Sequence, residues 1–320
     1  MAIAKCVTVF GGSGFIGRYV VARLAEQGWT IRVAVRRPVR ARFLKPLGDV
    51  AQVVPLPCDI RDPEHVRCAL RGSAAAVNLV GILQPQGRQT FDSVHVEGAD
   101  NIATAAAAEG IASVVHVSAL GADPDSRSDY ARSKGVAEQR IRDTLPGTTI
   151  VRPSVVFGPE DDFFNRFASM ARFSPFLPLI GGGETRFQPV YAGDVAEAVV
   201  KCLSERDCSG QTFELGGPST YSFKELMQLI LETIGRKRLL VSLPWGFASF
   251  LGSALQNLPG APLTRDQVEQ LKRDNILSGE FPGLTELGIR PHTVEVIIPT
   301  YLDRYRRSGR AAGRLSPGSG

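Results

Sequence analysis

A glycine-rich loop near the N-terminus constrains the fold of this chain more than any other feature. It reads Gly11-Gly12-Ser13-Gly14-Phe15-Ile16-Gly17 and lies between a short apolar run, Cys6–Phe10, and a helical pattern, Ile16–Gln27. Glycines let the backbone turn tightly and approach a ligand without Cβ atoms. A helix that begins at such a loop directs free backbone N–H groups at it, where they bind phosphate. The GxGxxG pattern between a strand and a helix therefore predicts a dinucleotide-binding βαβ unit.

The rest of the first half alternates strand and helix patterns. Continuous apolar strands between amphipathic helices are typical of a parallel sheet that is covered on both faces. The sequence predicts an α/β fold, with a doubly wound parallel sheet of the Rossmann type and a smaller C-terminal α/β subdomain. The predicted strands are Thr30–Val35, Ala51–Pro55, Ala74–Val80, Ser113–Val117, Thr148–Val156 and Thr212–Leu215, and the predicted helices after the first are Asp62–Leu70, Phe91–Ala108, Tyr130–Arg142, Gly193–Leu203, Ser222–Ile234 and Thr264–Arg273.

The length of 320 residues, with 43% hydrophobic and 22% charged residues, suits either one large domain or a large domain with a smaller second domain. Five cysteines without a CxxC pair indicate reduced thiols in the cytoplasm, and four scattered histidines predict no metal site. We expect an NADP(H)-binding Rossmann core at 1–156 with 193–217 returning to it, a substrate or docking subdomain at 157–192 and 218–303, and a basic disordered tail at 304–320.

The end of the second strand selects between NAD and NADP. NAD binders usually carry an acid there for the ribose 2′-OH, whereas this chain has Arg36 and Arg37, 19 and 20 residues after Gly17. Two guanidinium groups suit a 2′-phosphate and favour NADPH/NADP over NAD, and the alternative is two exposed loop arginines. Other strand ends predict contacts to the adenine from Asp59 and Ile60, and to the nicotinamide ribose from Asn78, Val80 and Gly81.

Tyr130 and Lys134 form a Tyr-x-x-x-Lys pair on the helix after the fifth strand. A spacing of four residues puts both side chains on one helix face. A lysine beside a tyrosine favours the phenolate, so the tyrosine becomes able to act as an acid or base near neutral pH. The pair predicts a catalytic site that also contacts the cofactor.

On these residues, the chain resembles the extended short-chain dehydrogenase/reductase family over roughly residues 5 to 235. The resemblance implies that Tyr130 donates or accepts the proton and that Lys134 bonds the nicotinamide ribose. It also assigns Pro153, in Val151-Arg152-Pro153, to the cofactor site. In that family a serine or threonine polarises the substrate carbonyl and an asparagine supports a proton relay.

Two of those catalytic groups are replaced in this chain. His95 stands where the family has the asparagine, and the run Ser118-Ala119-Leu120 puts Leu120 where the catalytic serine or threonine is expected. Ser118 remains a candidate for the pocket wall. Loss of the hydroxyl removes a hydrogen bond worth about 2 to 4 kcal/mol in the transition state. We therefore expect a weak or vestigial Tyr130–Lys134 pair.

A narrower resemblance is to the NADPH-binding accessory subunits of respiratory complex I and their bacterial relatives. It rests on the stretches Asp161–Met170, Asp266–Asn275 and Leu287–Arg306. It implies a tightly held structural NADPH, partners among complex I subunits near the quinone site, and a peripheral position on the cytoplasmic face of the inner membrane, or the matrix side in mitochondria. The aromatic segments Phe163–Phe187 and Pro244–Leu258 would form either a docking face or the core of the smaller subdomain.

The C-terminal arginines account for the net charge of +5, because residues 304–320 contain five arginines and no acid. They indicate either a solvated end or contact with an anionic partner such as an acidic lipid surface. No aromatic-interleaved basic patch accompanies them, so nucleic acid is not favoured as a partner. Two functional alternatives stay open beside the structural subunit: an active NADP-dependent reductase or nucleotide-sugar epimerase or dehydratase, and a redox-sensing NADP(H) binder.

Overall fold

The computed structural model describes residues 5–256 and 263–306. The chain forms two compact units, each described here by itself. The described residues of the first unit are 5–154, 192–216 and 277–290, and those of the second are 155–191, 217–256, 263–276 and 291–306. The sequence assigned 277–290 to the smaller subdomain, whereas in the structure this segment joins the first unit. Glu214 explains its position, because its backbone N–H donates to the Pro282 carbonyl at 3.0 Å and its carboxylate accepts from Ser278 at 2.8 Å.

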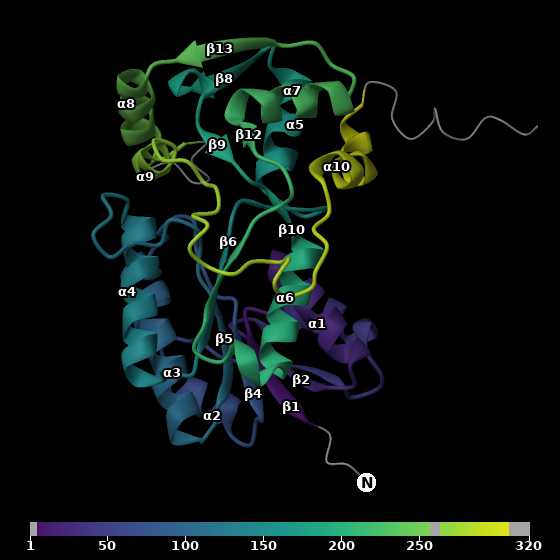
Figure 1. Ribbon diagram of the computed structural model, residues 1–320, viewed down its shortest axis with the longest axis vertical. Coiled ribbons are helices and arrows are strands. Elements are labelled where there is room, and N and C mark those ends of the chain that lie inside the picture. Colours follow the sequence, from purple (N-terminus) through teal and green to yellow (C-terminus); the bar gives the residue numbers. More distant parts are fainter. Residues whose placement is uncertain (1–4, 257–262, 307–320) are drawn as a thin grey trace, which may run out of the picture. The chain divides into compact units, whose positions relative to one another are not determined.

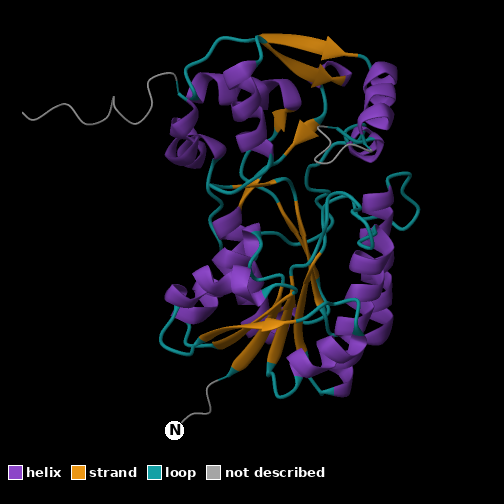
Figure 2. Cartoon of the chain, turned by 180° about the vertical axis from the view of Figure 1, so that it is seen from behind, coloured by secondary structure: helices purple, strands orange, loops and turns teal. Residues whose placement is uncertain are grey.

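A seven-stranded parallel sheet forms the centre of the first unit (Figures 1 and 2). The strand order is β11-β6-β5-β4-β1-β2-β3, so the chain moves outward from β1 in both directions. This order confirms the predicted doubly wound α/β class, and its switch point lies between β1 and β4, where such sheets bind ligands at the carboxyl ends of the strands. The strands are β1 (Cys6–Phe10), β2 (Thr30–Val35), β3 (Val53–Pro57), β4 (Ala75–Asn78), β5 (Ser113–Val117), β6 (Thr149–Pro153) and β11 (Thr212–Leu215).

Helices cover both faces of this sheet. Figure 1 shows α1 (Phe15–Glu26) and α6 (Ala192–Ser204) on one side, and α2 (Pro63–Leu70), α3 (Gly98–Ala108) and α4 (Asp129–Thr144) on the other. Asp62 caps α2, since its side chain accepts from the backbone N–H groups of Glu64 and His65. Alanines 99, 103 and 137 pack α3 closely against α4. The N-terminal part of the predicted helix Phe91–Ala108 is wound as a π-helix, Asp92–Glu97.

Aromatic side chains form much of the core of the second unit. Phe157, Phe164, Phe187 and Phe223 are buried together with aliphatic residues of its helices. Four of the six phenylalanines in the segment 163–187 pack in this core, whereas Phe173 and Phe176 are exposed. Ser222 and Glu225 form a capping box at the start of α7, with the Ser222 side chain accepting the Glu225 N–H. The elements are the two-stranded pairs β7 (Val156–Phe157) with β10 (Val190–Tyr191), β9 (Arg186–Phe187) with β12 (Tyr221–Ser222), and β8 (Phe176–Ile180) with β13 (Leu239–Leu243), and the helices α5 (Phe163–Phe173), α7 (Phe223–Thr233), α8 (Trp245–Leu255), α9 (Arg265–Gln270) and α10 (Val294–Leu302).

Several predicted boundaries differ from the structure. The strand predicted at 148–156 breaks at Ser154, because its backbone N–H donates to Leu215 in β11 while the residues after it belong to the second unit. Helix α10 was not predicted, since Pro299 lies inside it. Part of the predicted basic tail is folded: Arg304 contacts Asn165, and Arg306 donates to the Thr233 carbonyl at 2.9 Å. The remaining tail arginines, Arg307, Arg310 and Arg314, lie outside the described residues. Within the described residues, no helix has the length and apolar character needed to cross a bilayer.

Replacing Gly135 with alanine should destabilise the first unit. A Cβ atom there would lie 2.4 Å from the backbone N of Pro124 and 2.5 Å from the carbonyl carbon of Asp123, so helix α4 or this loop would have to move. We expect the free energy of unfolding, measured in urea, to fall by about 1–3 kcal/mol. Gly246→Ala is the control, because no atom lies within 4 Å of its Cβ position and alanine favours helix. Equal losses in both variants would contradict the packing argument.

Candidate functional site

The glycine loop joins β1 to α1. Three of its positions, Gly11, Gly12 and Gly17, require glycine for different steric reasons. Gly11 has a positive φ of 76°, and its carbonyl accepts the Gly14 N–H at 2.9 Å. A Cβ atom on Gly12 would press on the valines of β1, β2 and α1 at 3.0–3.2 Å, and one on Gly17 would lie 2.6 Å from the Gly11 carbonyl oxygen. Helix α1 therefore approaches the loop closely, with Gly14 as its N-cap and no acid in its first turn. Such an end attracts anions.

A cavity of about 630 Å³ opens beside this loop, at the carboxyl ends of β1, β2, β3 and β4. It brings together many of the residues predicted to contact the cofactor: Gly11, Ser13, Gly14, Arg36, Arg37, Asp59, Ile60, Val80 and Gly81. Other lining residues were not predicted from the sequence, including Arg40, Arg61, Ile82, Gln86 and Gln89. The basic residues at 40 and 61 were detectable as cations just after strand ends, whereas no sequence signal marks the two glutamines.

The charges around the cavity are mostly positive. Arg36, Arg37, Arg40 and Arg61 line it, with Asp59 as the one acid among the lining residues. Asp59 is already engaged, since its two carboxylate oxygens accept from Arg61 at 2.9 and 2.5 Å. The hydrogen bonds from Arg61 hold the pKa of Asp59 below its usual value. The cavity therefore presents three arginines without a lining acid to neutralise them.

The other predicted cofactor residues do not line the cavity. Asn78 is buried behind it, where its Oδ1 accepts the Val80 N–H at 3.0 Å and its Nδ2 lies 3.0 Å from His116 Nδ1. Asn78 thus positions the cavity wall. Pro153 ends β6, and its carbonyl accepts the Leu120 N–H at 3.0 Å. Gly12 and Gly17 serve packing, Phe15 and Ile16 begin α1, and Tyr130, Lys134 and Ser118 are described below.

Lys134 is buried in the first unit. Its Nζ donates to the Val117 carbonyl at 3.1 Å and lies 3.6 Å from where a Cβ on Gly81 would be, so it borders the cavity wall. Burial lowers the pKa of Lys134 to about 8, although Glu138 opposes the shift. Glu138 is itself paired with Arg152, at 2.6 Å. Within the described residues, Lys134 has no hydrogen-bond acceptor besides Val117, so this ammonium group remains available to a ligand hydroxyl.

Tyr130 packs edge-on against two rings of the segment 91–95. Its ring centroid lies 5.9 Å from that of Phe91 and 5.5 Å from that of His95. Helix α4 begins one residue earlier, at Asp129, and is capped by Ser128, whose side chain accepts the Ala131 N–H. The predicted pair with Lys134 therefore lies on the first turns of a capped helix.

The end of β5 lacks a hydroxyl at the predicted catalytic position. Leu120 occupies that position in the sequence, and its side chain is buried. Ser118 is also buried, and its Oγ has no hydrogen-bond partner in the described part of the chain. A buried hydroxyl without a partner costs free energy. Ser118 is thus the nearest hydroxyl in sequence, two residues before the expected place.

His95, at the position where the family has an asparagine that supports the proton relay, belongs to a chain of hydrogen bonds that ends on backbone groups. Its Nε2 accepts the Ile82 N–H at 2.9 Å, so the proton of the neutral ring lies on Nδ1. Nδ1 is 2.8 Å from Ser133 Oγ, which donates to the Tyr130 carbonyl at 2.8 Å. Burial, with Lys134 nearby, lowers the pKa of His95 to about 2. His95 therefore connects the cavity wall at Ile82 to helix α4 through hydrogen bonds. Ser133, its partner on α4, was not predicted from the sequence.

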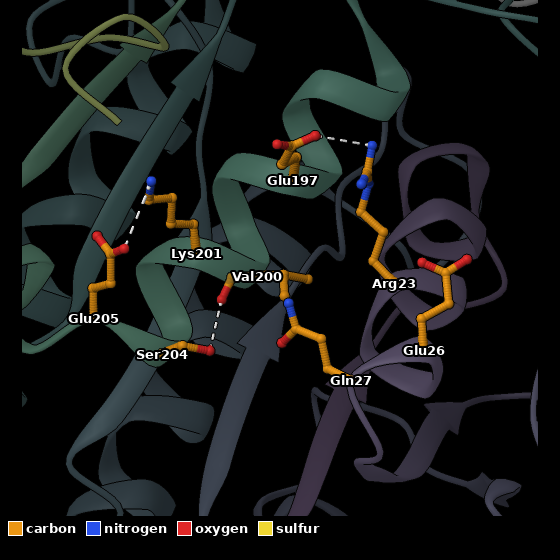
Figure 3. Close-up of a pocket in the computed structure, with 8 residues that line it drawn as sticks. All are labelled: Arg23, Glu26, Gln27, Glu197, Val200, Lys201, Ser204 and Glu205. Carbon is orange, nitrogen blue, oxygen red and sulfur yellow. Dashed lines mark hydrogen bonds and ion pairs between the residues drawn. The ribbon is translucent and has the colours of Figure 1, made fainter. Parts of the chain in front are cut away.

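A second, polar groove of about 350 Å³ lies between α1 and α6 and contains none of the predicted residues (Figure 3). Each of its two cations is paired with a glutamate: Arg23 lies 3.1 Å from Glu197, and Lys201 lies 3.7 Å from Glu205. In the described part of the chain, no group of three or more histidine, cysteine or acidic side chains is arranged to hold a metal ion. The cavity beside the glycine loop is therefore the candidate site.

The buried neutral His95 predicts a specific loss of stability in acid. Its pKa is about 2 when folded and about 6.5 when unfolded, so below pH 6.5 only the unfolded chain gains a proton. The free energy of unfolding should therefore fall with pH by about 1.4 kcal/mol per unit from this residue. His95→Asn should flatten the slope between pH 6 and 4.5 in urea titrations. Exposed His65→Asn is the control and should leave the slope unchanged. An unaltered slope in His95→Asn would show that the ring is accessible to protons.

Comparisons with known proteins agree with this geometry. A model of the NAD dependent epimerase/dehydratase family matches residues 7–216. The mitochondrial NADH-ubiquinone oxidoreductase 40 kDa subunit of Neurospora crassa is 33% identical over 300 residues, which cover 93% of this chain and 79% of the fungal protein. A ceramide reductase of Caulobacter vibrioides is 29% identical over 238 residues, covering 74% of this chain and 73% of the reductase.

Among solved structures, the UDP-glucose 4-epimerase of Thermus thermophilus in complex with NAD has a similar fold. The TM-score is 0.71 at 21% sequence identity, over 95% of this chain and 100% of the epimerase. The resemblance to the extended short-chain dehydrogenase/reductase family and to complex I accessory subunits is thus confirmed. The chain belongs to the NAD dependent epimerase/dehydratase family.

Proposed function

We propose that this chain is an accessory subunit of respiratory complex I that holds NADP(H) as a structural ligand, docks near the quinone site and turns over substrate weakly or not at all. It would lie peripherally on the cytoplasmic face of the inner membrane, or on the matrix side in mitochondria. One observation carries the proposal: the groups that would hold a nucleotide are complete, whereas those that would activate a substrate carbonyl are not. The similarity to the fungal 40 kDa subunit along 93% of the chain supports it.

The residues around the cavity fit a dinucleotide with a 2′-phosphate. Gly14 and the first turn of α1 leave room and free N–H groups for a pyrophosphate. Arg36 and Arg37 follow β2, where the adenosine ribose would lie, and the only lining acid is neutralised by Arg61. A 2′-OH would find no free carboxylate there, so NADP(H) is favoured over NAD(H).

The nicotinamide end has one strong anchor. Lys134 is a buried cation with donor capacity left after its bond to the Val117 carbonyl, as a ribose hydroxyl requires. When bound, the nicotinamide would supply hydride chemistry. The protein side of such chemistry is incomplete, because Leu120 offers no hydrogen bond to a carbonyl oxygen.

The His95 chain also argues against efficient proton relay. Its members run from the Ile82 N–H through His95 and Ser133 to the Tyr130 carbonyl, so the chain ends on backbone groups at both ends. A backbone amide and carbonyl neither deliver nor remove protons at useful rates. The depressed pKa of His95 keeps the ring neutral throughout the physiological range. We infer that His95 stabilises the site and does not return a proton to Tyr130.

The main alternative is an active NADP-dependent reductase, or a nucleotide-sugar epimerase or dehydratase. Tyr130 and Lys134 are both present on α4, and one relative is a ceramide reductase. A redox-sensing NADP(H) binder is the third reading, and it would bind the reduced and oxidised nucleotides with very different affinities. Measurements of substrate turnover and of nucleotide exchange distinguish these three functions.

The arginine pair should determine nucleotide choice. Charge-assisted hydrogen bonds are worth about 1.5–3 kcal/mol, so Arg36→Ala or Arg37→Ala should raise the Kd for NADPH about 10- to 100-fold. The Kd for NADH should change little, because the 2′-OH gains nothing from either arginine. Isothermal titration of each nucleotide measures both values. Arg42→Ala is the matched control, since Arg42 is exposed and outside the cavity lining. Equal losses for NADPH and NADH would remove the basis for NADP(H) specificity.

Native purification tests the structural role. We expect the chain, isolated from its own cell, to carry about one NADPH and to co-purify with complex I subunits identified by mass spectrometry. Tyr130→Phe should preserve both, because the glycine loop, the arginine pair and Lys134 would hold the nucleotide without the phenolic hydroxyl. The reductase alternative predicts steady NADPH oxidation with a carbonyl substrate, lost in Tyr130→Phe. Free nucleotide exchange together with no complex I association would falsify the proposed function.

A further inference from the structure

A short hairpin in the loop after β4 forms part of the wall of the nucleotide cavity. Gln86 and Gln89 make an antiparallel bridge, in which the Gln86 N–H donates to the Gln89 carbonyl at 2.9 Å and the Gln89 N–H donates back at 3.1 Å. The turn between them, Gly87-Arg88, begins with a positive φ of 58° at Gly87, as tight hairpin turns require. We call residues 86–89 the glutamine hairpin.

Both glutamines of the hairpin line the cavity. Residues directly opposite each other in an antiparallel pair project to the same side, so the two amides lie next to each other. In the part of the chain that the structure describes, neither side-chain amide has a hydrogen-bond partner. A glutamine amide has an oxygen that accepts and a nitrogen that donates. The hairpin therefore offers two complete amides to a ligand.

Hydrogen bonds on both sides fix the position of the glutamine hairpin. Arg61 follows β3, and its Nη1 donates to the Arg88 carbonyl at 2.8 Å. Directly after the hairpin, the Thr90 N–H donates to Ser93 Oγ at 3.0 Å and the Ser93 N–H donates to Thr90 Oγ1 at 3.1 Å. The two amides are thus held in place before a ligand arrives, which reduces the entropy lost on binding.

Arg61 also shows which end of the nucleotide would reach the hairpin. Asp59 and Ile60, at the end of β3, are the residues predicted to contact the adenine, and Arg61 connects Asp59 to the Arg88 carbonyl. The hairpin therefore lies at the adenine end of the cavity. Arg61 donates three hydrogen bonds to the Asp59 carboxylate, from its backbone N–H, Nε and Nη2. A carboxylate accepts about four such bonds, so Asp59 has little capacity left for the adenine.

We propose that Gln86 and Gln89 bind the edge of the adenine base formed by its 6-amino group and N7, in place of Asp59. The amino group donates and N7 accepts, so a glutamine amide matches this edge with two hydrogen bonds. A carboxylate would accept from the amino group and could not donate to N7. The proposal rests on the proposed function, because it takes NADP(H) as the ligand, and it adds the residues that select the base.

Isothermal titration of the full chain with NADPH and its deamino analogue tests the proposal. The analogue carries a carbonyl oxygen in place of the 6-amino group, so each amide would face two acceptors and form one hydrogen bond instead of two. We expect the unaltered chain to bind the analogue about tenfold more weakly than NADPH. Gln86→Ala/Gln89→Ala should bind the two nucleotides within about twofold of each other, because its affinity for NADPH falls while that for the analogue changes little.

A fragment of the nucleotide locates the effect in the adenine half. Adenosine 2′,5′-bisphosphate contains the adenine and the 2′-phosphate and lacks the nicotinamide. The double glutamine variant should bind it about tenfold more weakly than the unaltered chain does. An unchanged affinity for this fragment would show that the glutamines contact another part of the nucleotide, and it would overturn the proposal.

Two control variants should keep the preference for NADPH over the analogue. Arg88→Ala removes an exposed side chain of the same hairpin and keeps the carbonyl that Arg61 binds. Gln27→Ala removes a glutamine amide from the groove between α1 and α6. Thermal melts by circular dichroism establish that all variants fold.

The outcomes separate this proposal from the proposed function. Equal binding of NADPH and its analogue by the unaltered chain overturns the proposal alone. A preference that survives in the double glutamine variant also overturns it and assigns the base to Asp59. Failure to associate with complex I, with the glutamine-dependent preference intact, refutes only the proposed function. Absence of any NADPH binding refutes both.

Discussion

The close approach of helix α1 to the loop before it is the constraint on which the first unit depends. Gly12 and Gly17 let backbone meet backbone at distances that any side chain would prevent. This contact sets α1 against β1 and β2 and directs its N-terminus at the cavity. The order of the sheet then brings the ends of β2, β3 and β4 to the same place. Nucleotide binding of the proposed kind is a consequence of that packing.

The opposite wall of the cavity depends on buried polar contacts instead of on glycine. Asn78 holds the Val80 backbone, and His95 holds the Ile82 backbone and connects it to Ser133 on α4. Buried hydrogen bonds of this kind are expensive to break, because each leaves a polar group without a partner. The wall that borders Lys134 is therefore rigid. Rigidity suits a nucleotide that stays bound more than one that exchanges at each turnover.

The two units differ in the side chains that their surfaces expose to solvent. The first unit displays paired charges in its second groove, where arginine and lysine are matched by glutamates, as a solvated surface allows. The second unit exposes large apolar side chains, among them Phe173, Leu239, Phe247 and Phe250. Exposed apolar side chains in such number are typical of surfaces that contact a partner.

The sequence by itself determined the Rossmann sheet, the glycine loop, the cap of α2 and the capping box of α7, because each depends on neighbours within a few positions along the chain. It also located Arg36, Arg37 and Asp59 at the cavity, since strand ends of a parallel sheet converge at one edge. Only the tertiary structure decided that Asp59 is neutralised by Arg61, that His95 bonds Ser133, and that 277–290 pairs with β11. The last two contacts join residues far apart in the sequence. Asp59 and Arg61 are neighbours in a loop, where no periodicity shows which side chains face each other. The same holds for the aromatic segments. Four of the six phenylalanines of 163–187 pack in the core, whereas Phe247 and Phe250 are exposed, because burial depends on which elements pack together and not on hydrophobicity alone.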